Sequence, residues 1–135
     1  MAEFIFKDLV KSSGLEQQFH IESAAVSTEE IGNAIYSPAK RCLNGHGIPF
    51  DKNKTARQIT RQDYDRFDMI IYMDRMNLRW LKYIIPNDPE GKFRLMMSFS
   101  GHERDVADPW YTGDFETTFR DITEACKALL NELKK

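Results

Sequence analysis

Cysteine is scarce in this chain of 135 residues, which contains only Cys42 and Cys126. Two cysteines far apart in the sequence do not form the disulfide framework of a small secreted protein, so we expect two reduced, partly buried thiols. Cys42 and His46 are separated by one helical turn, which would place two zinc ligands on one helix face. No second pair has ligand spacing, so the sequence predicts no metal and no cofactor.

Long apolar runs and an excess of positive charge are also missing. No stretch approaches the roughly 20 residues that span a bilayer, and the net charge of -2 gives no general attraction to nucleic acid or to an anionic membrane. The initial stretch MAEFIFKDLVKSSG has acids within its apolar part and lacks the basic beginning of a secretory signal. The sequence therefore predicts a cytoplasmic protein that binds neither nucleic acid nor a membrane.

Helical and strand patterns alternate along the chain. Helices are predicted where apolar residues repeat at helical spacing, over 2–13, 74–85 and 115–134. Another is predicted where Ser37 supplies a cap and Pro38 a first helical residue, and it ends near Gly45 or Gly47. Strands or extended segments are predicted where apolar and β-branched residues alternate or run together: 19–27, 55–60, 67–73 and 92–99. A helical turn capped by Thr60 or Asp63 is predicted directly after the segment 55–60. The alternation indicates a single α/β domain over residues 1–135, with a mainly parallel sheet.

The stretch DVADPWYTGDF, residues 105–115, carries the most chemistry in the chain. It combines an acid, a proline, two aromatic residues and a glycine directly before the last predicted helix. Such a loop suits a carboxyl group that donates a proton in a slot shaped for a flat substrate. Asp108-Pro109 is also a common way to open a turn, in which case the aromatic residues would pack in the core.

Several stretches, in order, resemble one enzyme family, the low-molecular-weight protein-tyrosine-phosphatases. MAEFIFKDLV is similar to the first helix of the family, and IESAAVSTEEIG is similar to its second strand and the following loop. RCLNGHGI and KTARQITRQDYDRFDMIIYMDRMNLRWL resemble its middle third, and DVADPWYTGDFETTF resembles its acid loop. The resemblance covers nearly the whole chain and implies a three-layer α/β sandwich.

The resemblance also implies a reaction and roles for residues. In this family a cysteine thiolate attacks the phosphorus of phosphotyrosine, backbone N–H groups and one arginine hold the phosphate, and an aspartic acid protonates the leaving phenolate. No metal takes part. By this resemblance Asp108 is the general acid, Trp110 and Tyr111 wall the substrate slot, and the substrate is a phosphotyrosine protein or a small aryl phosphate.

Three further positions match parts of the family's pocket. Ser23 and His46 match residues that hydrogen-bond to the phosphate loop and hold its shape, although His46 is equally explained as a histidine at a helix end. Glu29 lies where the family often presents an aromatic residue, and with Glu30 it would repel anionic peptides. A solvated loop in which Ser27 is a weak cap explains the two acids at least as well.

The family's nucleophile has no counterpart in these residues. Its phosphate loop is Cys, five residues, Arg, then Ser or Thr, followed directly by the first helix. Six positions after Cys42 is Ile48, and six positions after Cys126 is Glu132. We therefore expect residues 1–135 to lack the nucleophile, the arginine and the family's central first strand, and to be inactive as they stand.

Three hypotheses explain why the chain resembles the phosphatase family but lacks its nucleophile. In the favoured one, the start of a phosphatase has been misassigned or cut. In the second, a short non-catalytic product pairs its exposed strand edges with another copy, as a homo-oligomer or strand-swapped dimer, which size-exclusion chromatography at several concentrations would detect. The third, an arsenate reductase, needs the same phosphate-loop cysteine and relay cysteines that the chain does not have.

Overall fold

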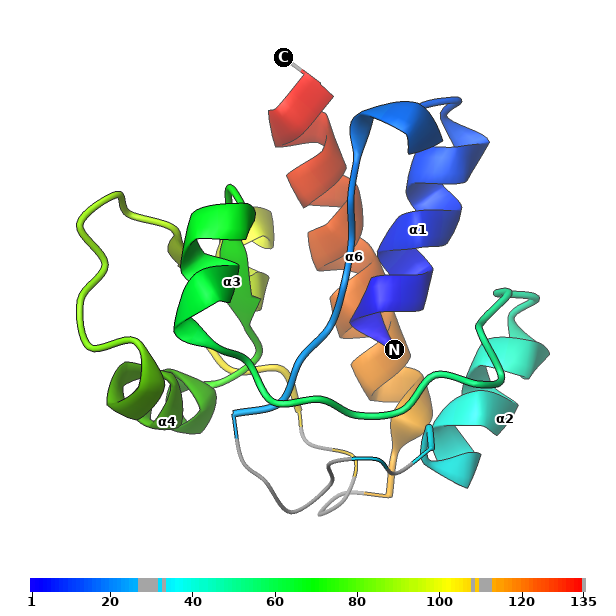
Figure 1. Ribbon diagram of the computed structural model, residues 1–135. Helices are drawn as coiled ribbons and strands as arrows, with labels where there is room; N and C mark the ends of the chain where they lie inside the picture. The colour runs from blue at the N-terminus through cyan, green and yellow to red at the C-terminus, as the bar shows by residue number, and fades with distance from the viewer. Residues whose placement is uncertain (27–31, 33, 108, 110–112, 135) are drawn as a thin grey trace.

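The two ends of the chain form a pair of helices at the centre of the main core. The computed structural model describes residues 1–26, 32, 34–107, 109 and 113–134. Helices α1 (Ala2–Ser12) and α6 (Phe115–Lys134) pack side by side and run in the same direction (Figure 1). Both were predicted from helical spacing. Their inward stripes form a buried cluster with residues of α2 and of the segment after the second strand: Ile5, Val10, Leu43, Met97, Ala125, Cys126 and Leu129.

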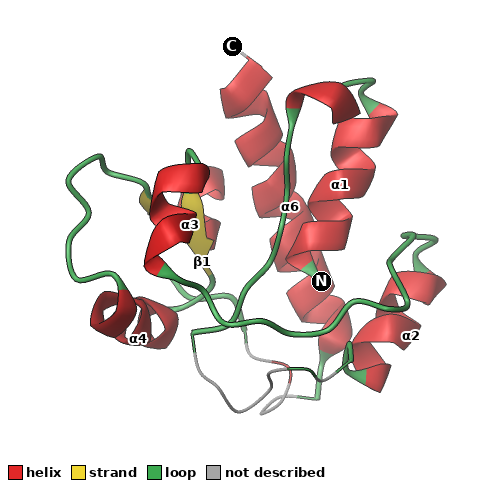
Figure 2. Cartoon of the chain, viewed as in Figure 1, coloured by secondary structure: helices red, strands yellow, loops and turns green. Residues whose placement is uncertain are grey.

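The sheet is small and parallel, and helix predominates over strand in the described chain (Figure 2). Strand β1 (Ile70–Tyr72) pairs with β2 (Phe93–Leu95), with Ile70 opposite Phe93. Helix α4 (Arg75–Ile84) connects the two strands, as a parallel pair requires. The predicted α/β class with a parallel sheet is confirmed.

The strand predicted over 92–99 is wrong after Leu95. Residues Met96–Ser100 form the 3-10 helix η2, in which Met96 and Met97 are buried in the main core beside α6. An alternating strand would place only one of two consecutive residues on the core face, whereas a helical turn buries both.

The strand predicted over 19–27 is also wrong over its described part. Residues 19–24 form no ladder, and only Ala25 pairs, in a parallel bridge with Gln58. The Ala25 N–H donates to the Arg57 carbonyl at 2.7 Å, and the Ile59 N–H donates to the Ala25 carbonyl at 2.8 Å. A strand needs a continuous partner, and only this residue has one. The segment 55–60 is extended with isolated bridges, as predicted.

Side chains determine where the remaining helices begin. Helix α3 (Arg61–Arg66) begins at Thr60, which forms a capping box with Asp63, and this agrees with the prediction. Helix α2 (Ser37–Gly45) begins one residue earlier than predicted, because the Lys40 N–H donates to the Tyr36 carbonyl at 3.1 Å. Tyr36 is therefore the cap residue in place of Ser37.

A second, smaller core joins α3, β1 and α4. Its buried residues are Tyr64, Ile70, Leu81 and Ile85. Within the described residues, none of the helices has the length and apolar character needed to cross a bilayer.

Candidate functional site

A cavity of about 290 Å³ lies at the carboxyl end of β1. Its lining includes residues at or directly before the starts of α1, α2, α4 and α6: Met1, Tyr36, Asp74 and Phe115. Ligands of open α/β folds bind at this end of parallel strands. The N-terminus of a helix carries a partial positive charge, which favours a negatively charged ligand. N–H groups at the starts of α4 and α6 already donate to the carboxylates of Asp105, Asp74 and Asp114, so this attraction comes mainly from the starts of α1 and α2.

The segment that leads into the predicted acid loop is attached to the cavity wall on both sides. The Val106 N–H donates to the Met73 carbonyl at 2.9 Å, which extends the edge of β1. The Thr118 hydroxyl, on α6, donates to the Ala107 carbonyl at 2.8 Å. Ala107 and Pro109 both line the cavity. The chain on either side of position 108 is therefore part of the cavity wall.

Four of the predicted site residues lie outside the described residues. They are Glu29, Asp108, Trp110 and Tyr111, and their roles remain predictions. Ser23 and His46 are described, and they lie at two separate clusters, each built around a glutamate that the sequence interpretation did not select.

Ser23 belongs to a cluster around Glu3, in the first turn of α1. The Ser23 hydroxyl donates to Glu3 Oε1 at 2.7 Å, Lys7 Nζ donates to Oε2 at 2.6 Å, and Lys54 Nζ is 3.2 Å from Oε1. Glu3 is buried. Burial by itself would raise the pKa of Glu3, but the hydrogen bonds from Lys7, Ser23 and Lys54 outweigh it and hold this pKa below its ordinary value of 4.5. The cluster fixes the start of α1, next to the cavity.

Replacing Glu3 with glutamine should lower the free energy of unfolding by about 1–3 kcal/mol at pH 7, because a buried carboxylate loses charged hydrogen bonds. A depressed pKa stabilises the fold above the ordinary pKa, and the contribution is lost as the pH falls through the lower folded-state value. The difference between the variant and the wild type in urea unfolding should therefore shrink below about pH 4. Glu16→Gln, at an exposed glutamate, is the control. A difference that stays constant down to pH 3 would contradict the role of the Glu3 charge.

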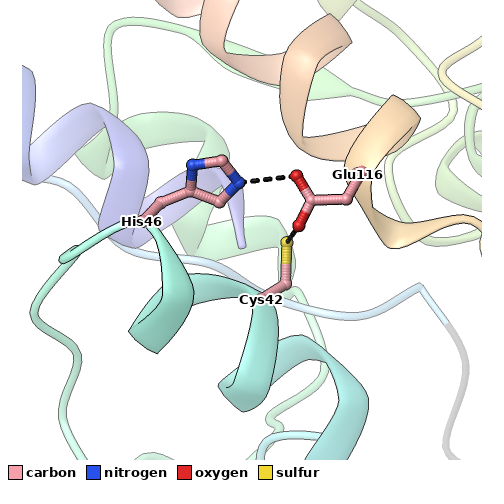
Figure 3. Close-up of side chains that lie close together, drawn as sticks. All are labelled: Cys42, His46 and Glu116. Carbon is pink, nitrogen blue, oxygen red and sulfur yellow. Dashed lines mark hydrogen bonds and ion pairs between the residues drawn. The ribbon is translucent and has the colours of Figure 1, made fainter.

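His46 belongs to the second cluster, between the end of α2 and the start of α6 (Figure 3). Its Nε2 lies 2.7 Å from Glu116 Oε2, and its ring stacks on Phe119 with centroids 3.8 Å apart. Cys42 Sγ donates to Glu116 Oε1 at 3.7 Å and to the Phe115 carbonyl at 3.6 Å. His46 is thus the cap residue that directly follows α2, and its described partner is an acid of α6.

Neither cysteine has the surroundings of a nucleophile. Burial, together with the charge and the hydrogen bond of Glu116, raises the pKa of the Cys42 thiol. Burial raises the pKa of Cys126 to about 12, in the middle of α6. A nucleophilic cysteine needs the opposite, a pKa lowered by a helix N-terminus or by nearby cations. Both thiols are therefore protonated at neutral pH.

The sequence and the fold are both similar to those of characterised proteins. The family model described as low molecular weight phosphotyrosine protein phosphatase matches residues 1–135. A protein of that description from Gallus gallus is 36% identical over 137 residues, which cover 98% of this chain and 85% of the relative. The low molecular weight protein-tyrosine-phosphatase YfkJ of Bacillus subtilis is 35% identical, over 100% of this chain and 87% of the relative.

Two crystal structures show the same fold. That of YfkJ from Bacillus subtilis superposes with a TM-score of 0.92 at 34% identity, covering 98% of this chain and 84% of that chain. The structure of SP-PTP, a low molecular weight protein tyrosine phosphatase from Streptococcus pyogenes, superposes with a TM-score of 0.86 at 37% identity. The match covers 98% of this chain and 82% of that chain.

Proposed function

The chain belongs to the low molecular weight phosphotyrosine protein phosphatase family, and we propose that its domain hydrolyses phosphotyrosine or a small aryl phosphate through a phosphocysteine intermediate. The observation that carries the proposal is the cavity at the carboxyl end of β1, where four helices begin. A dianionic phosphate is the kind of group that uncapped helix N-termini attract.

The proposed roles follow the chemistry of the leaving group. Asp108 protonates the leaving phenolate and then activates water against the phosphocysteine. Its sequence neighbours Ala107 and Pro109 line the cavity, which supports this role. Trp110 and Tyr111 wall the slot for the aromatic ring, and Glu29 lies at its mouth.

Ser23 and His46 would steady the loop that holds the phosphate. The fixed positions of both side chains support this role, since Ser23 is bonded to Glu3 and His46 is stacked on Phe119. In this proposal neither side chain touches the reacting phosphorus. Their effect on turnover would pass through the shape of the phosphate loop.

The nucleophile of this reaction is neither Cys42 nor Cys126. Both thiols are buried, and burial raises the pKa of each. Both also lie within helices, on α2 and α6, and neither is followed by an arginine six positions later. We therefore propose that the polypeptide of residues 1–135 is inactive by itself and that activity requires the family's cysteine and arginine, which these residues do not supply.

The test compares two polypeptides with p-nitrophenyl phosphate as substrate. Residues 1–135 alone should show no turnover above the background of a blank purification. The same residues preceded by the first strand and phosphate loop of the Bacillus relative should turn over the substrate. Replacing the cysteine of the added loop with serine should abolish that activity. Turnover by residues 1–135 that persists through purification and disappears on Asp108→Asn would refute the inactivity of this polypeptide, and a folded but inactive extended form would refute the phosphatase proposal.

A further inference from the structure

A cysteine, a histidine and a glutamate from two helices meet at one point of the surface (Figure 3). Cys42 lies in the last turns of α2, His46 caps the end of that helix, and Glu116 lies in the first turn of α6. Their Sγ, imidazole nitrogen and carboxylate oxygen all lie within 4.8 Å of one another. We propose that this triad binds one divalent zinc ion, with the three side chains as ligands and water in a fourth position.

The distances from the two Glu116 oxygens to Cys42 Sγ and to His46 Nε2 are near those of a tetrahedral zinc site, and all three ligand groups lie within 4.8 Å of one another. Bond lengths of about 2.0–2.3 Å place neighbouring ligand atoms about 3.3–3.7 Å apart. Cys42 Sγ and Glu116 Oε1 are already 3.7 Å apart. His46 Nε2 and Glu116 Oε2 are 2.7 Å apart and would separate by less than about 1 Å, a movement within reach of a glutamate side chain that is 63% exposed.

The surroundings hold the ligands in place and leave a route for the ion. The flat stacking of His46 on Phe119, with ring planes 9° apart, fixes the plane in which Nε2 points at Glu116. A second cavity, of about 580 Å³, is lined by both Cys42 and Glu116, so the ion can enter from solvent. Arg41 lines the same cavity together with two acids, Asp114 and Glu116, so negative charge is in excess there and favours a cation.

Zinc binding would join His46 to two side chains, Cys42 and Glu116, to which the proposed phosphatase chemistry gives no role. Thiolate, imidazole and carboxylate are the three ligand types of zinc sites, and three protein ligands with one water are typical of open sites. Binding releases the proton of Sγ to solvent as the Zn–S bond forms, so affinity should rise with pH. The bound ion would join the end of α2 to the start of α6. The inference does not depend on the proposed function.

The experiment titrates zinc chloride into the metal-free 135-residue chain and into Glu116→Gln, followed by calorimetry. The wild type should bind one zinc per chain, and the variant at least about 10-fold more weakly, because a neutral amide is a poor replacement for a carboxylate ligand. Glu116 is exposed, so this variant should keep its circular dichroism spectrum. Glu124→Gln is the matched control, since Glu124 lies on the same helix and is 3.7 Å from His102, but among the described residues this pair is not joined by a third ligand. Its zinc affinity should equal that of the wild type.

Cobalt(II) supplies a second measurement that identifies the sulfur ligand. A thiolate bound to cobalt gives an intense charge-transfer band in the near ultraviolet, and this band should appear in the wild type and disappear in Cys42→Ala. If Cys42→Ala does not fold, the band in Glu116→Gln, which should form only at higher cobalt concentration, decides the question. Absence of zinc binding, equal affinity in Glu116→Gln and the wild type, or a band that persists without Cys42 would each overturn the proposal.

Discussion

Replacing Asp108 with asparagine, in a form that carries the nucleophile, should lower kcat for phosphotyrosine by about 100- to 10,000-fold. The phenol of tyrosine has a pKa of about 10, so its anion is a poor leaving group unless a proton reaches the oxygen as the P–O bond breaks. Asparagine has nearly the same shape and can still form hydrogen bonds, but its amide is not acidic enough to protonate the leaving oxygen. KM should change much less than kcat, because the phosphate is held by other groups.

Comparison of two substrates separates proton donation from a general loss of structure. The decrease in kcat caused by Asp108→Asn should be largest with phenyl phosphate. It should be smaller with p-nitrophenyl phosphate, because a more acidic phenol leaves more easily without a proton donor. Asp105→Asn is the matched control, because Asp105 is an exposed acid of the same stretch that accepts a hydrogen bond from the Arg75 N–H at 3.1 Å. This control should leave kcat nearly unchanged. An equal loss with both substrates, or in both variants, would contradict the assignment of Asp108 as general acid.

Replacing Asp63 with asparagine should have the largest effect on stability, a loss of about 2–3 kcal/mol in the free energy of unfolding. Asp63 is buried, and its carboxylate accepts hydrogen bonds from both terminal nitrogens of Arg57, at 2.9 and 3.1 Å, and from the Thr60 N–H at 2.8 Å. Asparagine keeps one acceptor oxygen but turns an NH₂ group toward the Arg57 guanidinium. The variant therefore loses the ion pair and half of the capping box that starts α3.

Urea unfolding across the acid range would measure this loss. Burial acts to raise the pKa of Asp63, but the hydrogen bonds from Arg57 and Thr60 outweigh it and hold the pKa below its ordinary value of 3.8. The stabilisation by this carboxylate is thus complete above that value and lost as the pH falls below it. Asp65→Asn, at an exposed acid of the same helix, is the control and should change stability by less than about 0.5 kcal/mol. Equal effects of the two variants would show that Asp63 has no special role.

The sequence predicts the helices of this fold better than its strands. The stripe that includes Ile122 and Leu129 repeats over the full length of α6, and such a pattern can bury one face only as a helix. Residues 19–24 have the alternation of a strand but form no backbone ladder with any of the described residues. Met96 and Met97 could belong to a strand or to a helical turn, and contact with α6 decides between them. Strand assignment thus depends on partners that local sequence does not reveal.

Of the candidate site, only the part that lies in one short stretch of sequence, residues 105–115, could be predicted. The acid and aromatic residues of 105–115 stand together in the sequence, and their assignment remains a prediction because Asp108, Trp110 and Tyr111 lie outside the described residues. Glu116 gave no signal, since 70 positions separate it from His46 and only the packing of α6 against α2 brings them together. Glu3 was visible as an acid in a first turn, but its burial was not.

The pairing of α1 with α6 has a consequence for how the protein is made. These helices lie at opposite ends of the chain, yet each covers the apolar face of the other. During synthesis α1 leaves the ribosome long before α6 exists, so the face of α1 that packs on α6 stays exposed until α6 is translated. Contacts between distant segments also slow folding, because a long loop must close before they form. Until α6 is made, the nascent chain therefore exposes apolar surface that can aggregate.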